Sequence, residues 1–425
     1  MKNTRTITRS VAAVTAVAAL AAISGCSGDS GDTVDGVTTL TFWHNGTADP
    51  ILSIWQDAVD AYEDENPNIK IDVQPIQNED FSTKIPLALS SDDPPDIYFN
   101  QGGGLLATQV QSGQVADITD LTKDWIGDVG PAAGNWQVEG AQYGVPYAMQ
   151  LVGFWYRTDL FEQAGIEGTP TTMDELTEDI EKLKDADITP IAVGGKDRWP
   201  DAFYYNTFAV RECGEDVLKE SLAAVDLSDE CFTKAGQDVI DFIASEPFQD
   251  GFNGTPAQEG SGSSAGLVAS GDAAMELQGT WDKSVMQGLT DTDLNPLLGW
   301  FPFPSVDGDG DPSATLGGGD GFSCTQKHVK ECVDFLHYLS SADIQTKLVE
   351  SQVVTIPVIE EATSAITDPV IQSIYDFNSE AAYVQTYFDI ALPTGVGSAL
   401  NDAVADLFAG KGTASSVPDA VAAAK

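Results

Sequence analysis

The apolar positions in the first hundred residues alternate between the period of a strand and the period of a helix. Residues 37–43 alternate and are β-branched, which predicts a strand. Asp49 and Pro50 then suit a helix start, and apolar residues recur at helical spacing over 51–62. The same alternation continues with a strand, a helix and a strand at residues 69–73, 81–89 and 96–99. This order predicts a parallel sheet with right-handed crossovers in an α/β fold.

The stretch at residues 271–281 predicts a junction between a buried strand and a helix. The strand ends at Gly279, and the helix is expected to begin near Thr280, a residue type that caps helices well. Trp281 then lies where α/β proteins bind their ligands, and its flat ring suits stacking on a ligand face. A tryptophan in the core is the alternative.

Two extended, proline-containing segments interrupt this pattern at residues 143–150 and 298–304. We interpret both as crossings between parts of the fold, with a separate buried strand at 153–157. Thr172 and Glu175 match a capping box at the start of a helix. Further elements are expected as a strand at 188–193 and helices at 333–339, 368–378 and 398–408.

The first 25 residues have the pattern of a signal peptide. Basic residues precede an apolar run at 11–23, and small residues then precede Cys26 in a pattern that resembles a bacterial lipobox. Cys26 is therefore expected to carry lipid, with 26–36 as a flexible tether. No later apolar run has spanning length. The mature protein is expected at the extracellular face of the cytoplasmic membrane, held by its lipid anchor only, as in Gram-positive lipoproteins.

The remaining four cysteines are expected to form disulfide bonds, because that compartment is oxidising. Three pairings are possible. We favour the two that join cysteines close in sequence, Cys213–Cys231 and Cys324–Cys332.

Charge narrows the choice of partners. The 425 residues include 66 acidic and 20 basic ones, for a net charge of −46. This surface repels nucleic acid and anionic lipid, so neither is expected as a partner. The protein is expected to be a monomer. With three histidines, no metal or other cofactor is expected. The acidic run 307–311 lacks the glycine and glutamate of a calcium loop, so we interpret it as a solvated turn.

Several short motifs, in this order along the chain, resemble the extracellular solute-binding lipoproteins of carbohydrate ABC importers, the family of maltose-binding protein. They are residues 40–43, 143–146, 169–176, 271–281 and 301–304. The resemblance implies a periplasmic-binding-protein-like fold: two α/β lobes joined by a multi-strand hinge, with the ligand cleft between them. It places lobe 1 at 37–146 plus 303–340 and lobe 2 at 147–302 plus 341–425.

The same resemblance implies a sugar site between the lobes. Sugars need aromatic rings for their apolar faces and polar groups for their hydroxyls. Trp281 aligns with a sugar-stacking tryptophan of the family. Further candidates are His44, Asn45, Asn100, Gln101, Gln150, Trp199, Asp320, Tyr383, Tyr387, Phe388 and Asp389.

The resemblance implies a binding protein that has no enzymatic activity. It would capture an oligosaccharide, expected to be neutral and longer than one ring, and deliver it to an ABC permease by closing its hinge. A surface glycoside hydrolase is the alternative, although no carboxylate pair stands in an obvious strand-end motif. A metal-capturing lipoprotein is disfavoured by the lack of a ligand-spaced cluster.

Overall fold

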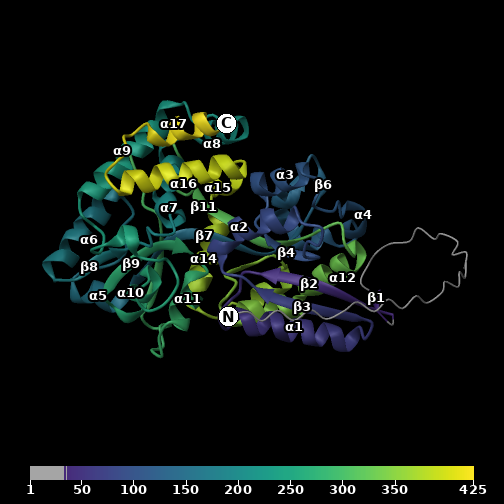
Figure 1. The fold of residues 1–425 in the computed structure, drawn as a ribbon. Helices are drawn as coiled ribbons and strands as arrows, with labels where there is room; N and C mark the ends of the chain where they lie inside the picture. Colours follow the sequence, from purple (N-terminus) through teal and green to yellow (C-terminus); the bar gives the residue numbers. More distant parts are fainter. Residues whose placement is uncertain (1–32, 35) are drawn as a thin grey trace, which may run out of the picture.

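The structure, a computed structural model, describes residues 33, 34 and 36–425. The predicted signal peptide and the lipidation site at Cys26 lie outside the described residues. Two α/β halves lie side by side, and the C-terminal helices cover one of them (Figure 1). Among the described residues, no helix has the length and apolar character needed to cross a membrane.

The sheet of the first half begins as the sequence predicts. Its first parallel strands and their crossover helices are β2 (Val37–His44), α1 (Ile51–Glu65), β3 (Ile69–Pro75), α2 (Asn78–Leu89) and β4 (Ile97–Asn100). The short strand β1 (Thr33–Val34) pairs with β2, and α3 (Gly103–Gln111) follows β4. The carboxyl ends of β2 and β4 therefore meet at one edge of the sheet.

The long strand β7 (Val145–Arg157) connects the two halves. Its first part pairs with β11 (Thr315–Cys324), which also pairs with β4. Its second part pairs with β9 (Ala273–Gly279) and β10 (Leu298–Pro302). Thirteen residues extend about 43 Å in a strand, enough to run through both sheets. The predicted crossing and the predicted buried strand are thus one continuous element.

The second half is built on β9. The strand β8 (Thr189–Ala192) lies parallel to β9. Helix α7 (Trp199–Glu212) follows β8, α10 (Ser264–Ser270) precedes β9, and α11 (Asp282–Gly288) follows β9. Helix α6 (Met173–Asp185) leads into β8.

The remaining elements surround these sheets. They are α4 (Thr119–Thr122), β5 (Gln137–Val138), β6 (Ala141–Gln142), α5 (Thr158–Gln163), α8 (Glu215–Ala224), α9 (Glu230–Ala244), α12 (Val329–Leu339), α13 (Ala342–Glu350), β12 (Ile356–Pro357), α14 (Pro369–Glu380), β13 (Val384–Thr386), α15 (Phe388–Ala391), α16 (Thr394–Phe408) and α17 (Ser416–Ala424), with 3₁₀ segments at Ile126–Trp136, Phe252–Gly254 and Glu360–Ala365.

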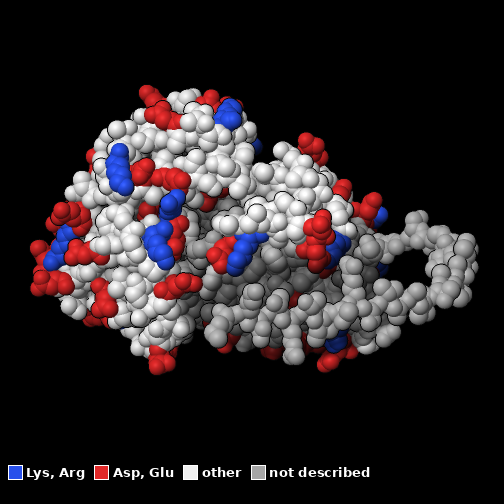
Figure 2. All heavy atoms as spheres, viewed as in Figure 1, with Lys and Arg blue, Asp and Glu red and all other residues white. Residues whose placement is uncertain are grey.

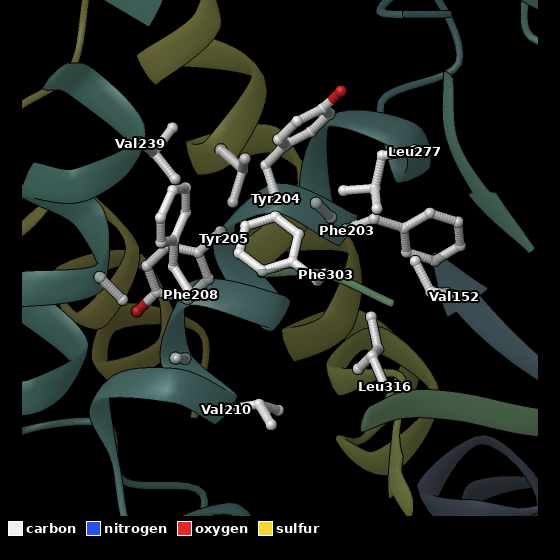
Figure 3. Close-up of a cluster of buried hydrophobic side chains, with 14 of the residues drawn as sticks. Val152, Phe203, Tyr204, Tyr205, Phe208, Val210, Val239, Leu277, Phe303 and Leu316 are labelled. Atoms are coloured by element: carbon white, nitrogen blue, oxygen red, sulfur yellow. The ribbon is translucent and has the colours of Figure 1, made fainter. Parts of the chain in front are cut away.

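Each half has its own hydrophobic core. In the second half, aromatic side chains of α7 pack against β7, β9 and the segment after β10, as Figure 3 shows for Phe203, Tyr204, Phe208, Leu277 and Phe303. The core of the first half forms around Leu40 and Phe42 of β2 and also contains apolar residues between 344 and 362. A third cluster, around Trp155, is made mostly of residues of the second half. Separate cores in the two halves suit two bodies that can move relative to each other.

Helix starts differ from the sequence prediction at two places and match it at a third. The capping box of α6 is present: Glu175 N–H donates to Thr172 Oγ1 at 3.2 Å, and the carboxylate of Glu175 accepts from Thr172 N–H. Helix α1 begins one residue late, with Pro50 rather than Asp49 at the cap. Helix α11 is capped at Trp281, so the prediction that Thr280 is its N-cap is wrong.

Both favoured disulfide bonds are confirmed. Cys213 at the end of α7 bonds Cys231 in α9, with Cα atoms 5.4 Å apart, and Cys324 at the end of β11 bonds Cys332 in α12, at 6.0 Å. Each bond links an element of the core to the helix that covers it.

Removing the Cys213–Cys231 bond by a double serine substitution should lower the free energy of unfolding by about 3 kcal/mol, since the bond closes an 18-residue separation. The Cys324–Cys332 bond closes 8 residues, so its removal should lower stability by about 2.5 kcal/mol. Urea unfolding of the two double variants tests this order. A smaller loss for the longer loop would contradict the chain-entropy argument.

Candidate ligand site between the two halves

Trp281 lies two residues after the end of β9, at the N-cap of α11, and is half-buried. Its ring covers Gly279, where an added Cβ would be 2.0 Å from the ring. Trp199, at the start of α7, has its ring centroid 6.3 Å away, and Phe203, one turn further, has its centroid at 6.4 Å. Two strand ends of the second half thus bring three aromatic rings together.

Tyr387 extends this group of rings towards the first half. Its ring lies 5.4 Å from that of Phe203, and it occupies the space beside Gly318 of β11, where a Cβ would be 2.4 Å from the ring. The hydroxyl oxygen of Tyr387 is buried without a described hydrogen-bond partner. We name Trp199, Phe203, Trp281 and Tyr387 the aromatic wall.

Thr280 anchors the turn that carries Trp281. Its Oγ1 donates to Gln150 Oε1 of β7 at 2.7 Å, and its N–H donates to the Leu151 carbonyl at 2.9 Å. Thr355 Oγ1 donates to Thr280 Oγ1 at 2.8 Å. Gln150, a predicted ligand residue, is buried and uses its carbonyl oxygen in this network. Its position therefore supports the Trp281 turn.

Asp320 and Gln101 meet although they are 219 residues apart in sequence. Gln101 Nε2 donates to Asp320 Oδ1 at 3.4 Å, and the pairing of β11 with β7 shifts register directly after Asp320. Such a bulge redirects a side chain from the sheet. Asp320 is half-buried, and burial raises its pKa to about 6, so it is mostly ionised at neutral pH. It can accept hydroxyl groups there.

The end of β2 places His44 and Asn45 at the same sheet edge. His44 is fully buried, and burial lowers its pKa to about 4, so it is neutral. Its Nδ1 accepts from Gly46 N–H at 3.1 Å, so Nε2 carries the proton and has no described partner. Asn45 is half-buried. The following loop approaches α11: a Cβ on Gly288 would lie 3.6 Å from the Asp49 carbonyl.

Asn100 is buried, and its side chain is already bonded within the protein. Its Nδ2 donates to Gln109 Oε1 at 2.7 Å, and its Oδ1 accepts from Gly102 N–H at 2.7 Å. These bonds shape the glycine-rich loop into α3. They leave this amide less available to a ligand than the sequence prediction assumed.

The candidates near the C-terminus differ in position. Phe388 is fully buried and lies 6.5 Å from Phe232 in the core, so in this conformation it faces other side chains. Asp389 accepts from Asn401 Nδ2 at 2.9 Å, and burial raises its pKa. Tyr383 is half-buried, and its pKa is raised to about 12, chiefly by burial. Tyr387 is the residue of this segment that joins the aromatic wall.

Phe203 was not predicted as a site residue. It is four residues after Trp199, and the helical pattern could have placed it on the same face of α7. Nothing in the local sequence indicated that Thr280 would bond to residues of β7.

Acidic groups outnumber basic ones on the surface, and the face in Figure 2 shows a recess between the two halves. Arg198, beside the aromatic wall, is exposed and forms an ion pair with Asp402.

Among the described residues, no group of three or more His, Cys, Asp or Glu side chains is arranged to hold a metal ion. In the acidic run, Asp311 accepts from Ser313 N–H at 2.8 Å in a tight turn.

Replacing Gly279 with alanine should displace the Trp281 ring, because the new Cβ has no room beside it. Overpacking of this kind lowers stability by about 1–3 kcal/mol. Displacement of the Trp281 ring should also change the tryptophan fluorescence of the ligand-free protein. Gly254→Ala is a matched control in the same half, since its Cβ would meet nothing within 4 Å. Equal effects of both substitutions would refute the close packing of the ring.

Comparison with known proteins places this geometry in a family. The profile of the bacterial extracellular solute-binding proteins matches residues 46–346. Two uncharacterised ABC transporter extracellular-binding proteins of Pyrococcus horikoshii are 27% and 24% identical, and the chain spans 58% and 56% of their length, less than two thirds. The diacetylchitobiose binding protein DasA of Streptomyces coelicolor is 27% identical over 66% of this chain and 64% of its own length.

Solved structures agree in fold. A protein from a study of xylan utilization by Caldanaerobius polysaccharolyticus is 26% identical, with a TM-score of 0.83 over 90% of this chain and 98% of its own. A chitin oligosaccharide binding protein is 23% identical, with a TM-score of 0.81 over 91% and 97%. The predicted two-lobe α/β fold is confirmed. The chain therefore belongs to the bacterial extracellular solute-binding protein family.

Proposed function

We propose that this protein captures a neutral oligosaccharide of more than one ring outside the cell and delivers it to an ABC permease. The aromatic wall is the observation that carries the proposal. Four rings from three separate segments pack against one another, and Trp199 and Trp281 among them are partly exposed. Aromatic rings are suited to the apolar faces of sugar units. Two relatives that are named as a diacetylchitobiose binding protein and a lactose-binding protein support the proposal.

Polar groups beside the aromatic wall suit hydroxyl ligands. Asp320 offers acceptors, Gln101 an amide, and the buried Nε1 of Trp199 and the Tyr387 hydroxyl have no described partner. Unpaired buried polar atoms are unfavourable, and a bound ligand would satisfy them. Anionic sugars would be repelled by the charge of Asp320.

Delivery would use the two-lobe architecture. We propose that β7 and β11 form part of a hinge about which the lobes close on the ligand. The packing favours assigning the apolar residues between 344 and 362 to lobe 1 instead of lobe 2, and we otherwise keep the predicted lobe segments. In this structure the lobes touch where Gly104 meets the backbone of α15: a Cβ there would be 2.4 Å from the Ala391 carbonyl.

A binding role without catalysis is supported by the relatives, which are named as binding proteins. We further propose that the mature protein is a monomer held at the membrane by lipid on Cys26. Mass spectrometry of the protein purified from membranes tests the lipid.

The test of the main proposal is titration calorimetry of the unlipidated protein with a panel of sugars. The panel should contain diacetylchitobiose, lactose and xylo-oligosaccharides, each with its monosaccharide, and acidic oligosaccharides as controls. We expect a neutral oligosaccharide to bind more tightly than its monosaccharide and than any acidic sugar. Binding of an acidic sugar or of a monosaccharide alone would overturn the substrate class.

A further inference from the structure

Two carboxyl groups, those of Glu276 and Asp282, lie in hydrogen-bond contact with each other at the Trp281 turn. Glu276 is in β9, five residues before Trp281, and Asp282 is the first residue of α11. Their exposed fractions are 1% and 0%. Glu276 Oε1 accepts from Ser264 Oγ at 2.5 Å and from Gln278 Nε2 at 3.4 Å. Glu276 Oε2 and both oxygens of Asp282 receive no N–H or O–H from any other described residue.

Among the described residues, the groups that act on the pKa values of this pair are acidic or neutral. Helix α7 contributes Asp201 and Tyr204, α10 contributes Ser264, and the loop before α7 contributes Asp197. Asp201 is itself fully buried, and burial raises its pKa to about 8. The charges of Glu276 and Asp201 add to burial in raising the pKa of Tyr204.

Three cations on adjoining elements are bound elsewhere. Arg211 of α7 donates to the Ala314 and Phe303 carbonyls. Lys283, next to Asp282 in α11, holds Asp368 at 2.5 Å. Arg157, at the end of β7, donates to the Val268 and Ala269 carbonyls and pairs with Asp159 at 2.8 Å. Two ionised carboxylates in this interior would therefore repel each other without compensation, which is strongly unfavourable.

We propose that Glu276 and Asp282 share one proton in a carboxyl–carboxylate hydrogen bond, and that this bond positions Trp281 for the ligand. The bond ties the middle of β9 to the first turn of α11, and Trp281 lies between the two tied residues in sequence. Glu276 and Asp282 are positioning residues, since they act through Trp281. The effect on the ligand rests on the proposed function, whereas the shared proton does not.

The raised pKa values determine how the stability contributed by the pair changes with pH. Burial, followed by the charge of Asp282, raises the pKa of Glu276 well above its usual value, and burial also raises the pKa of Asp282. The folded state thus keeps a proton that the unfolded state releases at the usual carboxyl pKa. The pair's contribution to stability is greatest in acid and declines as the pH rises to the folded pKa. Loss of the shared proton should then loosen the Trp281 turn.

The first test detects the proton without any ligand. Infrared spectra at neutral pH should contain a protonated carboxyl band that Glu276→Gln and Asp282→Asn each remove in difference spectra. Asp238→Asn is the control, because Asp238 forms a separate carboxyl contact with Glu212 beside Lys234. It should remove a band of its own without changing Trp281. Difference spectra without a lost carboxyl band for either pair variant would overturn the proposal.

The second test follows Trp281 and binding against pH. Acrylamide quenching of Trp281 fluorescence is obtained as the difference between each protein and the same protein carrying Trp281→Phe. In the wild type this quenching should increase at alkaline pH. It should stay level in Glu276→Gln, because the glutamine amide donates to Asp282 with no titrating proton. In Glu276→Ala it should be high at every pH.

Affinity for diacetylchitobiose should fall roughly tenfold between about pH 7 and pH 9 in the wild type and in Asp238→Asn, and remain level in Glu276→Gln. Identical profiles for the wild type and Glu276→Gln would overturn the positioning role. If diacetylchitobiose and xylotriose bind at no pH, the proposed function fails for these sugars, and the quenching profiles alone decide the positioning role.

Discussion

Replacing Trp281 with alanine should weaken oligosaccharide binding roughly thirtyfold or more, which is about 2 kcal/mol. The ring is half-buried, lies over Gly279 and contacts Trp199 and Phe203, so it is held in one orientation before the ligand arrives. A rigid ring loses little freedom on binding, and its removal takes away the stacking surface. Calorimetry with the tightest sugar of the panel measures the effect.

Trp125→Ala is the matched control. Trp125 is also half-buried, but it stacks on His337 of α12 at 4.4 Å in the first half, away from the aromatic wall. This substitution should leave affinity unchanged. A similar loss in both variants would show that the effect is general destabilisation, and unchanged affinity in Trp281→Ala would remove the aromatic wall from the binding site.

The buried ion pair between Lys283 and Asp368 should produce the largest loss of stability. Lys283 is 2% exposed, and its Nζ lies 2.5 Å from Asp368 Oδ2. Asp368 also caps α14, since its Oδ1 accepts from the N–H groups of Val370 and Ile371. Asp368→Ala leaves a buried ammonium without a partner, so the free energy of unfolding should fall by about 3–5 kcal/mol.

The double variant Lys283→Met, Asp368→Asn separates the charge from the cap. It keeps a capping side chain and removes both charges, so it should recover most of the lost stability. Urea unfolding of the two variants measures the difference. An Asp368→Ala variant as stable as the wild type would show that solvent reaches Lys283.

The same pair makes stability depend on pH. Burial opposes ionisation of Asp368, but the hydrogen bond and charge of Lys283 outweigh it and lower the pKa of Asp368. A lowered pKa stabilises the folded state above the usual carboxyl pKa, and this contribution disappears as the pH falls through the folded value. Acid unfolding of the double variant should therefore lack this component.

Local sequence was enough to predict much of the fold. The alternation of strands and helices up to β4, the capping box of α6 and the strand before Trp281 were all readable, because each depends on side-chain period and on residues a few positions apart. The two disulfide bonds join cysteines 18 and 8 residues apart, so the favoured pairing was also a local inference.

The site was only partly readable. The sequence singled out Trp281 and Trp199, which the structure brings together, but it could not separate polar side chains that are free from those that are bonded within the protein. Asn100 and Gln150 are bonded inside the protein, and Phe388 is in the core. Which polar group is free depends on what its neighbours in space donate or accept, and a linear pattern carries no such information.

By itself, the sequence determined that this chain forms an α/β protein with an aromatic strand-to-helix junction, because hydrophobic period and residue type set local structure. Only the tertiary structure decided that β7 is one strand shared by both sheets, that Thr280 holds Gln150 instead of capping a helix, and that the carboxyl groups of Glu276 and Asp282 meet. Each depends on contacts between segments distant in sequence or on the local dielectric of a packed interior, which arise only when the chain is folded.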